Sequence, residues 1–122
     1  MARIVNVSKG TTVAGQARKA ESFWARFVGL MGRRRLEEGE GLLIAPCSSV
    51  HTFFMRFPID VIFMDREGKV VKVAPALAPF RLALGGRGGR DVLEVTAGTA
   101  ARSNTAVGDR LAVEGDCEGG KE

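Results

Sequence analysis

Residues suited to metal and redox chemistry are scarce in this chain. Among 122 residues there is one histidine, His51, and there are two cysteines, Cys47 and Cys117. A structural zinc site needs three or four Cys, His or carboxylate ligands, which one histidine and two distant cysteines do not supply. A mixed site of His51, Asp60 and another acid is the arrangement left open. We predict no metal and no cofactor.

Long apolar segments are also missing. The longest apolar runs, such as residues 61–64, are far shorter than the ~20 residues that a membrane-spanning helix needs. Residues 1–10 contain no apolar stretch of the kind that a secretory signal carries. We therefore expect no membrane span and a cytoplasmic location, where both cysteines would be free thiols.

Motifs that identify common enzyme classes are absent. The sequence has no GxxxxGK[ST], no GxGxxG that opens a helix and no GxSxG. Cys47 and His51 could form a nucleophilic pair, but the position of Cys47 directly after Pro46 favours a small loop residue. The glycine-rich segment 85–90 has two RGG-like repeats without interleaved aromatics, which favours a flexible loop over an RNA-binding segment. Whether the protein is an enzyme stays open.

Positive charge is concentrated in the first third of the chain. The net charge is +4, and residues 1–39 hold eight Lys and Arg against three acids. Arg33, Arg34 and Arg35 are consecutive and could hold an anion such as phosphate. Glu37 and Glu38 follow closely and cancel much of this field. We favour a solvated, self-paired turn, and we do not expect nucleic acid as a partner.

Short apolar and β-branched runs dominate the rest of the sequence and predict strands. The hydrophobic fraction of 45% and charged fraction of 26% are typical of a soluble globular protein. The expected strands cover residues 3–7, 12–20, 41–45, 51–57, 59–64, 69–73 and 92–95, and residues 107–115 supply a turn and a last strand.

Two segments predict helices. In residues 20–31 the apolar side chains recur at helical spacing and fall on one face. Residues 97–103 form a shorter candidate, with Thr96 as the N-cap and Asn104 as a left-handed exit. The predicted fold is mainly β: a compact mixed or antiparallel β-barrel or rolled sheet, capped by the longer helix. We expect one domain over residues 1–115, a disordered tail over 116–122, and a monomer.

An acid within an apolar strand is the strongest hint of a site. Asp60 stands beside Val61, Ile62 and Phe63, and burying an unpaired carboxylate costs several kcal/mol. Asp60 therefore needs a cation or hydrogen-bond donors. The candidates are Arg26, Arg56, Arg81 and His51. The alternative to a ligand site is a structural hydrogen-bond network that holds the bend at Pro58.

Three functions follow from this reading. The first is a ligand- or peptide-binding module, with a polar site in the hairpin from His51 to Asp65 beneath a long connection over residues 74–91. The second is a small hydrolase with His51 as base and Asp60 orienting it. The third is weak binding of nucleic acid or an anionic surface through the basic first third. The predicted ligand-binding residues are His51, Phe54, Met55, Asp60, Arg81 and Glu94.

Several short motifs together resemble one protein family. These are R-x-x-G-L-M-G-R, H-[ST]-F-[WF]-M, I-D-x-x-F-x-D, V-L-E-x-x-A-G-T and G-D, and over residues 15–113 the chain resembles the bacterial and archaeal family known as domain of unknown function 192. The resemblance implies a compact β-rich single domain and supplies no reaction. Ser103 and Asn104 depart from the family's usual apolar residue and glycine. The matching positions are Arg26, Gly29, Leu30, Met31, Gly32, Arg33, Gly41, His51 to Met55, Ile59, Asp60, Phe63, Asp65, Glu94, Gly98, Thr99, Gly108 and Asp109.

Overall fold

The computed structural model describes residues 2–20, 38–44, 49–51, 58–78, 82–84 and 88–115. Within these ranges the chain forms nine strands and one short helix. The strands are β1 (Ala2–Asn6), β2 (Thr11–Ala20), β3 (Glu40–Ile44), β4 (Ser49–His51), β5 (Ile59–Met64), β6 (Val70–Leu77), β7 (Leu82–Leu84), β8 (Asp91–Thr96) and β9 (Leu111–Gly115), and the helix is α2 (Thr99–Arg102).

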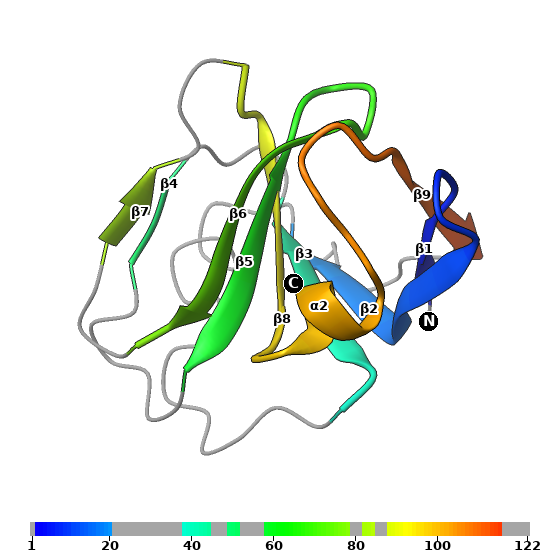
Figure 1. Cartoon of the computed structure of the whole chain (residues 1–122), viewed down its shortest axis with the longest axis horizontal. Helices are drawn as coiled ribbons and strands as arrows, with labels where there is room; N and C mark the ends of the chain where they lie inside the picture. Colours follow the sequence, from blue (N-terminus) through cyan, green and yellow to red (C-terminus); the bar gives the residue numbers. More distant parts are fainter. Residues whose placement is uncertain are drawn as a thin grey trace.

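Seven strands form one sheet in the order β6-β5-β8-β3-β2-β1-β9, which curls into a half-barrel (Figure 1). β2 and β3 are parallel and the other neighbours are antiparallel. β4 and β7 form a separate two-stranded sheet, on the side of β5 and β6 away from α2 (Figure 1). The prediction of a mainly β, mixed rolled sheet is confirmed.

Both faces of the central strands are buried. All six residues of β5 are buried, so apolar side chains pack on each side of the sheet. Because successive side chains of a strand point to opposite faces, the core divides into an inner cluster and an outer cluster. The inner cluster includes Ile4, Val13, Leu43, Ile62, Met64, Leu93, Val95 and Leu111. The outer cluster contains Ile44, Ile59, Val61, Phe63 and Val92.

The two edges of the sheet meet along a short stretch. The N–H of Leu111 donates to the carbonyl of Gly68 at 2.9 Å, and the N–H of Val70 donates to the carbonyl of Asp109 at 2.8 Å. Lys69 and Arg110 pair as an isolated antiparallel bridge between these bonds. Beyond Leu111 no hydrogen bond joins β9 to β6 in the described residues. Among the described strands the barrel is therefore closed along this short stretch only.

The Asp109 side chain supports this closure. Its Oδ2 accepts hydrogen bonds from Asn6 Nδ2 at 3.0 Å, Lys9 Nζ at 2.9 Å and the N–H of Ala106 at 3.0 Å. These donors, led by Asn6 and Lys9, lower the pKa of Asp109 to about 2. The loop before β9 is thereby tied to the end of β1.

The local chemistry of the turns was predicted correctly. β5 and β6 form the expected hairpin, with Gly68 at φ 86° and its N–H bonded to the carbonyl of Asp65 at 3.0 Å. Asn104 adopts the expected left-handed conformation after α2, with φ 58°. These features depend on neighbours in sequence, which is why a local reading finds them.

Two local predictions were wrong. The connection over residues 74–91 is not one long loop, because β6 continues to Leu77 and residues 82–84 form β7. β6 is the edge strand of its sheet, so Pro75 removes no hydrogen bond that the ladder needs. Thr96 is not the helix cap, because it pairs with Ile59 as the last residue of β8, and Gly98 occupies the N-cap position instead.

Other predictions fall outside the described residues. These are the helix predicted over residues 20–31, apart from Ala20, which ends β2 instead, and the arginines 33–35, the strand residues 52–57 and the tail 116–122. They stay predictions.

Replacing Gly68 tests the closure. An added Cβ would lie 2.4 Å from the carbonyl oxygen of Leu111, and the positive φ also disfavours any residue with a side chain. We expect Gly68→Ala to lower the free energy of unfolding by about 2–4 kcal/mol, measured by urea denaturation. Gly88→Ala is the matched control, since Gly88 has φ 85° and no atom within 4 Å of the added Cβ. Equal losses of unfolding free energy in the two variants would contradict a collision between the added Cβ and the carbonyl oxygen of Leu111.

Candidate functional site

Asp60 is held by backbone donors on the inner face of the sheet. Asp60 is part of β5 and is 1% exposed. Oδ1 accepts from the N–H of Ala76 at 2.7 Å. Oδ2 accepts from the N–H groups of Gly98 at 3.1 Å and Ala100 at 2.9 Å. The need for donors that the sequence indicated is met by three peptide N–H groups.

This arrangement joins three elements. The pairing of β5 with β6 shifts between Ile59–Leu77 and Val61–Ala74, so β6 bulges opposite Asp60. The bulge contains Ala76 at φ 47°, an unusual conformation for a residue with a side chain. Asp60 binds the N–H exposed by the bulge and the N–H groups at the start of α2. Its described contacts are those of a structural residue.

Glu94 is a second buried acid, and it lies on the opposite face. It stands opposite Val61 on one side and Leu42 on the other, whereas Asp60 stands opposite Val95. Directly opposed residues share a face and neighbours along a strand do not. The structure therefore places Asp60 and Glu94 on different faces of the sheet and does not bring them together.

The environment of Glu94 is apolar. The residue is 5% exposed among outer-cluster side chains such as Val61 and Val92, and its Oε1 has no hydrogen-bond partner among the described residues. Burial raises the pKa of Glu94 from its ordinary value of 4.5 to about 7. The acid thus changes charge near neutral pH. No feature of the sequence distinguished it from Asp60 in this respect.

The other predicted site residues are only partly placed. His51 ends β4, where its backbone pairs with Leu82 of β7. The side chain of His51, together with Phe54, Met55 and Arg81, lies outside the described part of the structure. Their grouping with Glu94 stays a prediction, as does a pairing of His51 with Asp60.

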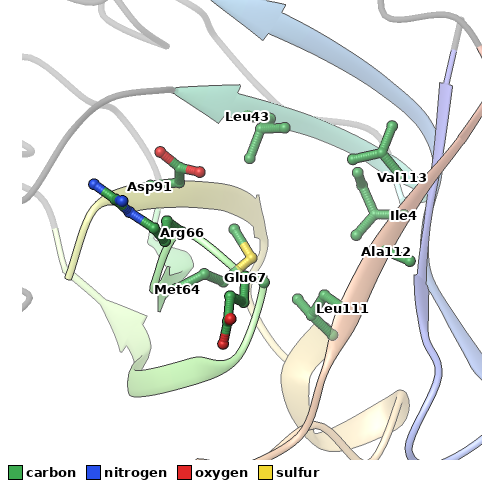
Figure 2. Close-up of a pocket in the computed structure, with 10 residues that line it drawn as sticks. Ile4, Leu43, Met64, Arg66, Glu67, Asp91, Leu111, Ala112 and Val113 are labelled. Atoms are coloured by element: carbon green, nitrogen blue, oxygen red, sulfur yellow. The ribbon is translucent and has the colours of Figure 1, made fainter. Parts of the chain in front are cut away.

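A partly open cavity of about 260 Å³ occupies the gap where β9 diverges from the β5–β6 turn. Figure 2 shows its residues facing one another from β9 and β1 on one side and from β3, β5 and the turn on the other. Most of the lining residues are apolar, and three are charged. The lining consists of Ile4, Leu43, Met64, Arg66, Glu67, Gly68, Asp91, Leu111, Ala112 and Val113.

The sequence did not reveal this cavity. Its residues come from five separate segments, and only the Asp65–Gly68 turn carries a recognisable local signal. The close approach of Gly68 to Leu111 brings the turn against β9, and the divergence of β9 beyond that point leaves the space. The cavity is a consequence of how the sheet curls.

The described ranges contain neither a metal-ligand cluster nor a membrane-spanning helix. No group of three His, Cys, Asp or Glu side chains there could hold a metal ion. None of the helices described is long and apolar enough to cross a membrane.

Fold and site define a class: a β half-barrel that buries Asp60 and Glu94 on opposite faces of its sheet and has a partly open cavity beside β9. The family model DUF192, described as "Uncharacterized ACR", matches residues 4–113, and the chain belongs to this family. The resemblance seen in the motifs is thus confirmed.

Curated relatives carry the name UPF0127. A Pyrococcus furiosus UPF0127 protein is 34% identical over 113 residues, covering 88% of this chain and 95% of the relative. A Pyrococcus abyssi UPF0127 protein is 33% identical over 117 residues, covering 91% and 97%.

Solved structures share the fold. A Novosphingobium aromaticivorans protein of unknown function has a TM-score of 0.78 at 22% identity, covering 91% of this chain and 82% of that one. A Sinorhizobium meliloti protein, provisionally described as a transcription regulator, has a TM-score of 0.77 at 26% identity, covering 92% and 91%.

Replacing Asp60 tests its structural role. In Asp60→Asn one carboxylate oxygen becomes an NH₂ group that cannot accept, so at least one buried N–H loses its partner. We expect a loss of about 2–4 kcal/mol in the free energy of unfolding, measured by urea denaturation at pH 7. The matched control is Glu94→Gln, the same change on the other face. A loss in Asp60→Asn no larger than in the control would contradict the assignment.

The titration of Glu94 gives a pH dependence. Below pH 4.5 the group is protonated in both the folded and the unfolded chain, so its burial costs no charge. As the pH rises from 4.5 through 7 the unfolded chain releases its proton first, and stability falls. Between pH 4.5 and pH 8 we expect Glu94 to remove about 3 kcal/mol of stability.

Comparison with a variant isolates this contribution. Glu94→Gln keeps the shape and cannot ionise, so its stability relative to the natural chain should increase over this interval. Urea denaturation of both proteins at several pH values measures the difference. Parallel pH profiles would show that Glu94 does not titrate as described.

Proposed function

We propose that this chain is a binding module whose ligand enters the cavity between β9 and the β5–β6 turn. The cavity volume carries the proposal: about 260 Å³ lies just below the roughly 300–1,000 Å³ usual for small-molecule sites. A compact ligand, or a single side chain of a larger one, matches that space.

The lining supports a ligand of mixed character. Leu43, Met64 and Leu111 give the cavity apolar walls, while Arg66, Glu67 and Asp91 add charged groups to its lining (Figure 2). Sites of this kind combine apolar walls with a few polar groups that set orientation. The proposed ligand therefore has an apolar body and a polar end.

The polar site predicted around His51 remains a second location for the same function. It would use Glu94 as its acid, because Glu94 faces the outer cluster and has an oxygen without a described partner. β4, which ends at His51, and β7 lie on the side of β5 and β6 away from α2 (Figure 1). Asp60 binds the start of α2, whereas Glu94 is on the opposite face of the sheet, which supports grouping Glu94 with His51. Its remaining residues, His51, Phe54, Met55 and Arg81, stay predictions.

Two alternatives receive less support. A hydrolase with His51 as base would need Asp60 to orient the imidazole, and the described bonds of Asp60 all go to backbone N–H groups. Binding of nucleic acid would rest on Arg18, Lys19, Arg26 and Arg33 to Arg35, and of these only Arg18 has its side chain among the described residues. The Sinorhizobium protein's provisional description as a transcription regulator is the one observation in its favour.

A matched ligand series tests the proposal. Hexanoate, hexylammonium and hexanol share an apolar body and differ in the polar end. The chain has four methionines, and Met64 lines the cavity. We expect at least one probe to shift the methyl resonance of Met64 in a saturable NMR titration.

A filled cavity provides the control. Val113 lines the cavity and is 49% exposed, so Val113→Trp should block the space at little cost to folding. Val107→Trp adds the same side chain at a position that is 63% exposed and outside the cavity. The first variant should abolish the Met64 response and the second should keep it. Absence of any response with all three probes would refute the proposed function.

A further inference from the structure

Among the described strands, β9 pairs along its length with β1 alone, and its other edge borders the cavity. β9 stands last in the sheet and pairs with β1 on its other side. The opposite edge of the sheet reaches it only through Gly68, Lys69 and Val70. From Ala112 to Gly115 no described strand lies against that side.

The direction of the backbone groups follows from the hydrogen bonds at the closure. Arg110 directs its carbonyl to Val7 on the β1 side, and Leu111 directs its N–H away from β1 to Gly68. Because these directions alternate along an antiparallel strand, Val113 turns both its N–H and its carbonyl outward. Gly115 likewise turns its N–H outward. No described residue bonds these groups.

The same strand supplies part of the cavity wall. Leu111 and Val113 share a face of β9, and both line the cavity. Figure 2 shows them across the space from Met64 and Leu43. A strand added at this edge would therefore lie along the cavity, and its alternate side chains would point into it.

We propose that the free edge of β9 binds an extended peptide by β-strand addition, with one apolar side chain of the peptide in the cavity. This inference rests on the proposed function and names its ligand class. Main-chain hydrogen bonds provide affinity in such complexes, and pockets for alternate side chains provide selectivity. The residue opposite Val113 occupies the cavity.

Charge defines one end of the partner. Lys69 and Arg110 pair at the closed end of the edge. Arg66 lines the cavity beside them, as do Glu67 and Asp91, and Asp65 lies in the same turn. Oδ1 of Asp65 is already bonded by the N–H groups of Glu67 and Lys69. With a net charge of +4 for the chain, this end suits a carboxylate. If the peptide pairs antiparallel to β9, its C-terminal end lies at this closed end of the edge.

A second copy of the chain fits the edge less well. The stretch of β9 without a described partner is short, and the turn that carries Gly68 bounds it. This turn would obstruct a whole sheet that approached β9. A single extended peptide needs no such clearance. Two copies would also bring together two net positive charges.

The test uses a defined peptide and the whole chain. The probe is acetyl-Thr-Val-Thr-Leu-Thr with a free C-terminal carboxylate, in which the leucine stands opposite Val113. We expect saturable binding, a shift of the Met64 methyl resonance, and protection of the Val113 amide. At nine-tenths saturation the hydrogen exchange of that amide should slow by about tenfold.

Two modified peptides separate the contributions. Methylation of the leucine nitrogen removes the donor to Val113 and keeps the side chain, and it should weaken binding at least tenfold. A C-terminal amide removes the charge and should weaken binding by about two- to fivefold. Equal affinity of the parent and N-methylated peptides would overturn strand addition, even if hexanol or its analogues still bind the cavity. Equal affinity of the peptides with a C-terminal carboxylate and a C-terminal amide would show that the closed end of the edge does not bind the carboxylate.

A backbone variant repeats the test from the protein side. Val113→Pro removes the outward N–H, and no bond to β1 is lost because that N–H points away from β1. Val113→Ala is the matched control for the lost side chain. The proline variant should bind the peptide at least tenfold more weakly than the alanine variant. If Val113→Pro does not fold, the affinities of the parent and N-methylated peptides for the natural chain test strand addition instead.

The state of the free protein gives a further outcome. If the Val113 amide is already protected without peptide, and protection increases with protein concentration, the edge binds a second copy and the proposal is wrong. If neither the peptide nor the hexyl probes affect Met64, the proposed function fails together with this inference.

Discussion

The hydrogen bonds between Gly68 and Leu111 and between Val70 and Asp109 hold the two ends of the sheet together. They are few, so the half-barrel is closed at one point and open beyond it. The open part is the cavity, and the strand that borders it, β9, has backbone groups that no described residue binds. Both proposals therefore depend on where this closure ends. Asn6 and Lys9, through Asp109, keep that point in place.

Two buried acids show how position decides the role of one functional group. Asp60 accepts three backbone hydrogen bonds and ties a bulge in β6 to the start of α2. Glu94 stands on the neighbouring strand, faces an apolar cluster and has its pKa raised to about 7. A carboxylate that is fully bonded stabilises the fold, whereas one that is desolvated without partners is available for a change of charge.

Local sequence signals predicted local structure well and failed where tertiary contacts decide. The turn at Asp65–Gly68 and the left-handed Asn104 depend on residues close in sequence, and both were found. The prolines near Ala76 suggested a loop, but an edge strand tolerates Pro75, so β6 continues to Leu77. Thr96 looked like a helix cap, but Asp60, 38 residues before Gly98, binds the N–H groups there.

The sequence by itself determined that strands dominate, that Asp60 would be shielded from water, and that the motifs belong to the DUF192 family. These follow from hydrophobic patterning and from short motifs, which are properties of neighbouring residues. Only the tertiary structure decided which face each acid occupies, where the sheet edges meet and where a cavity remains. Those depend on strand register and on the curl of the sheet, and register arises from contacts between segments far apart in the chain.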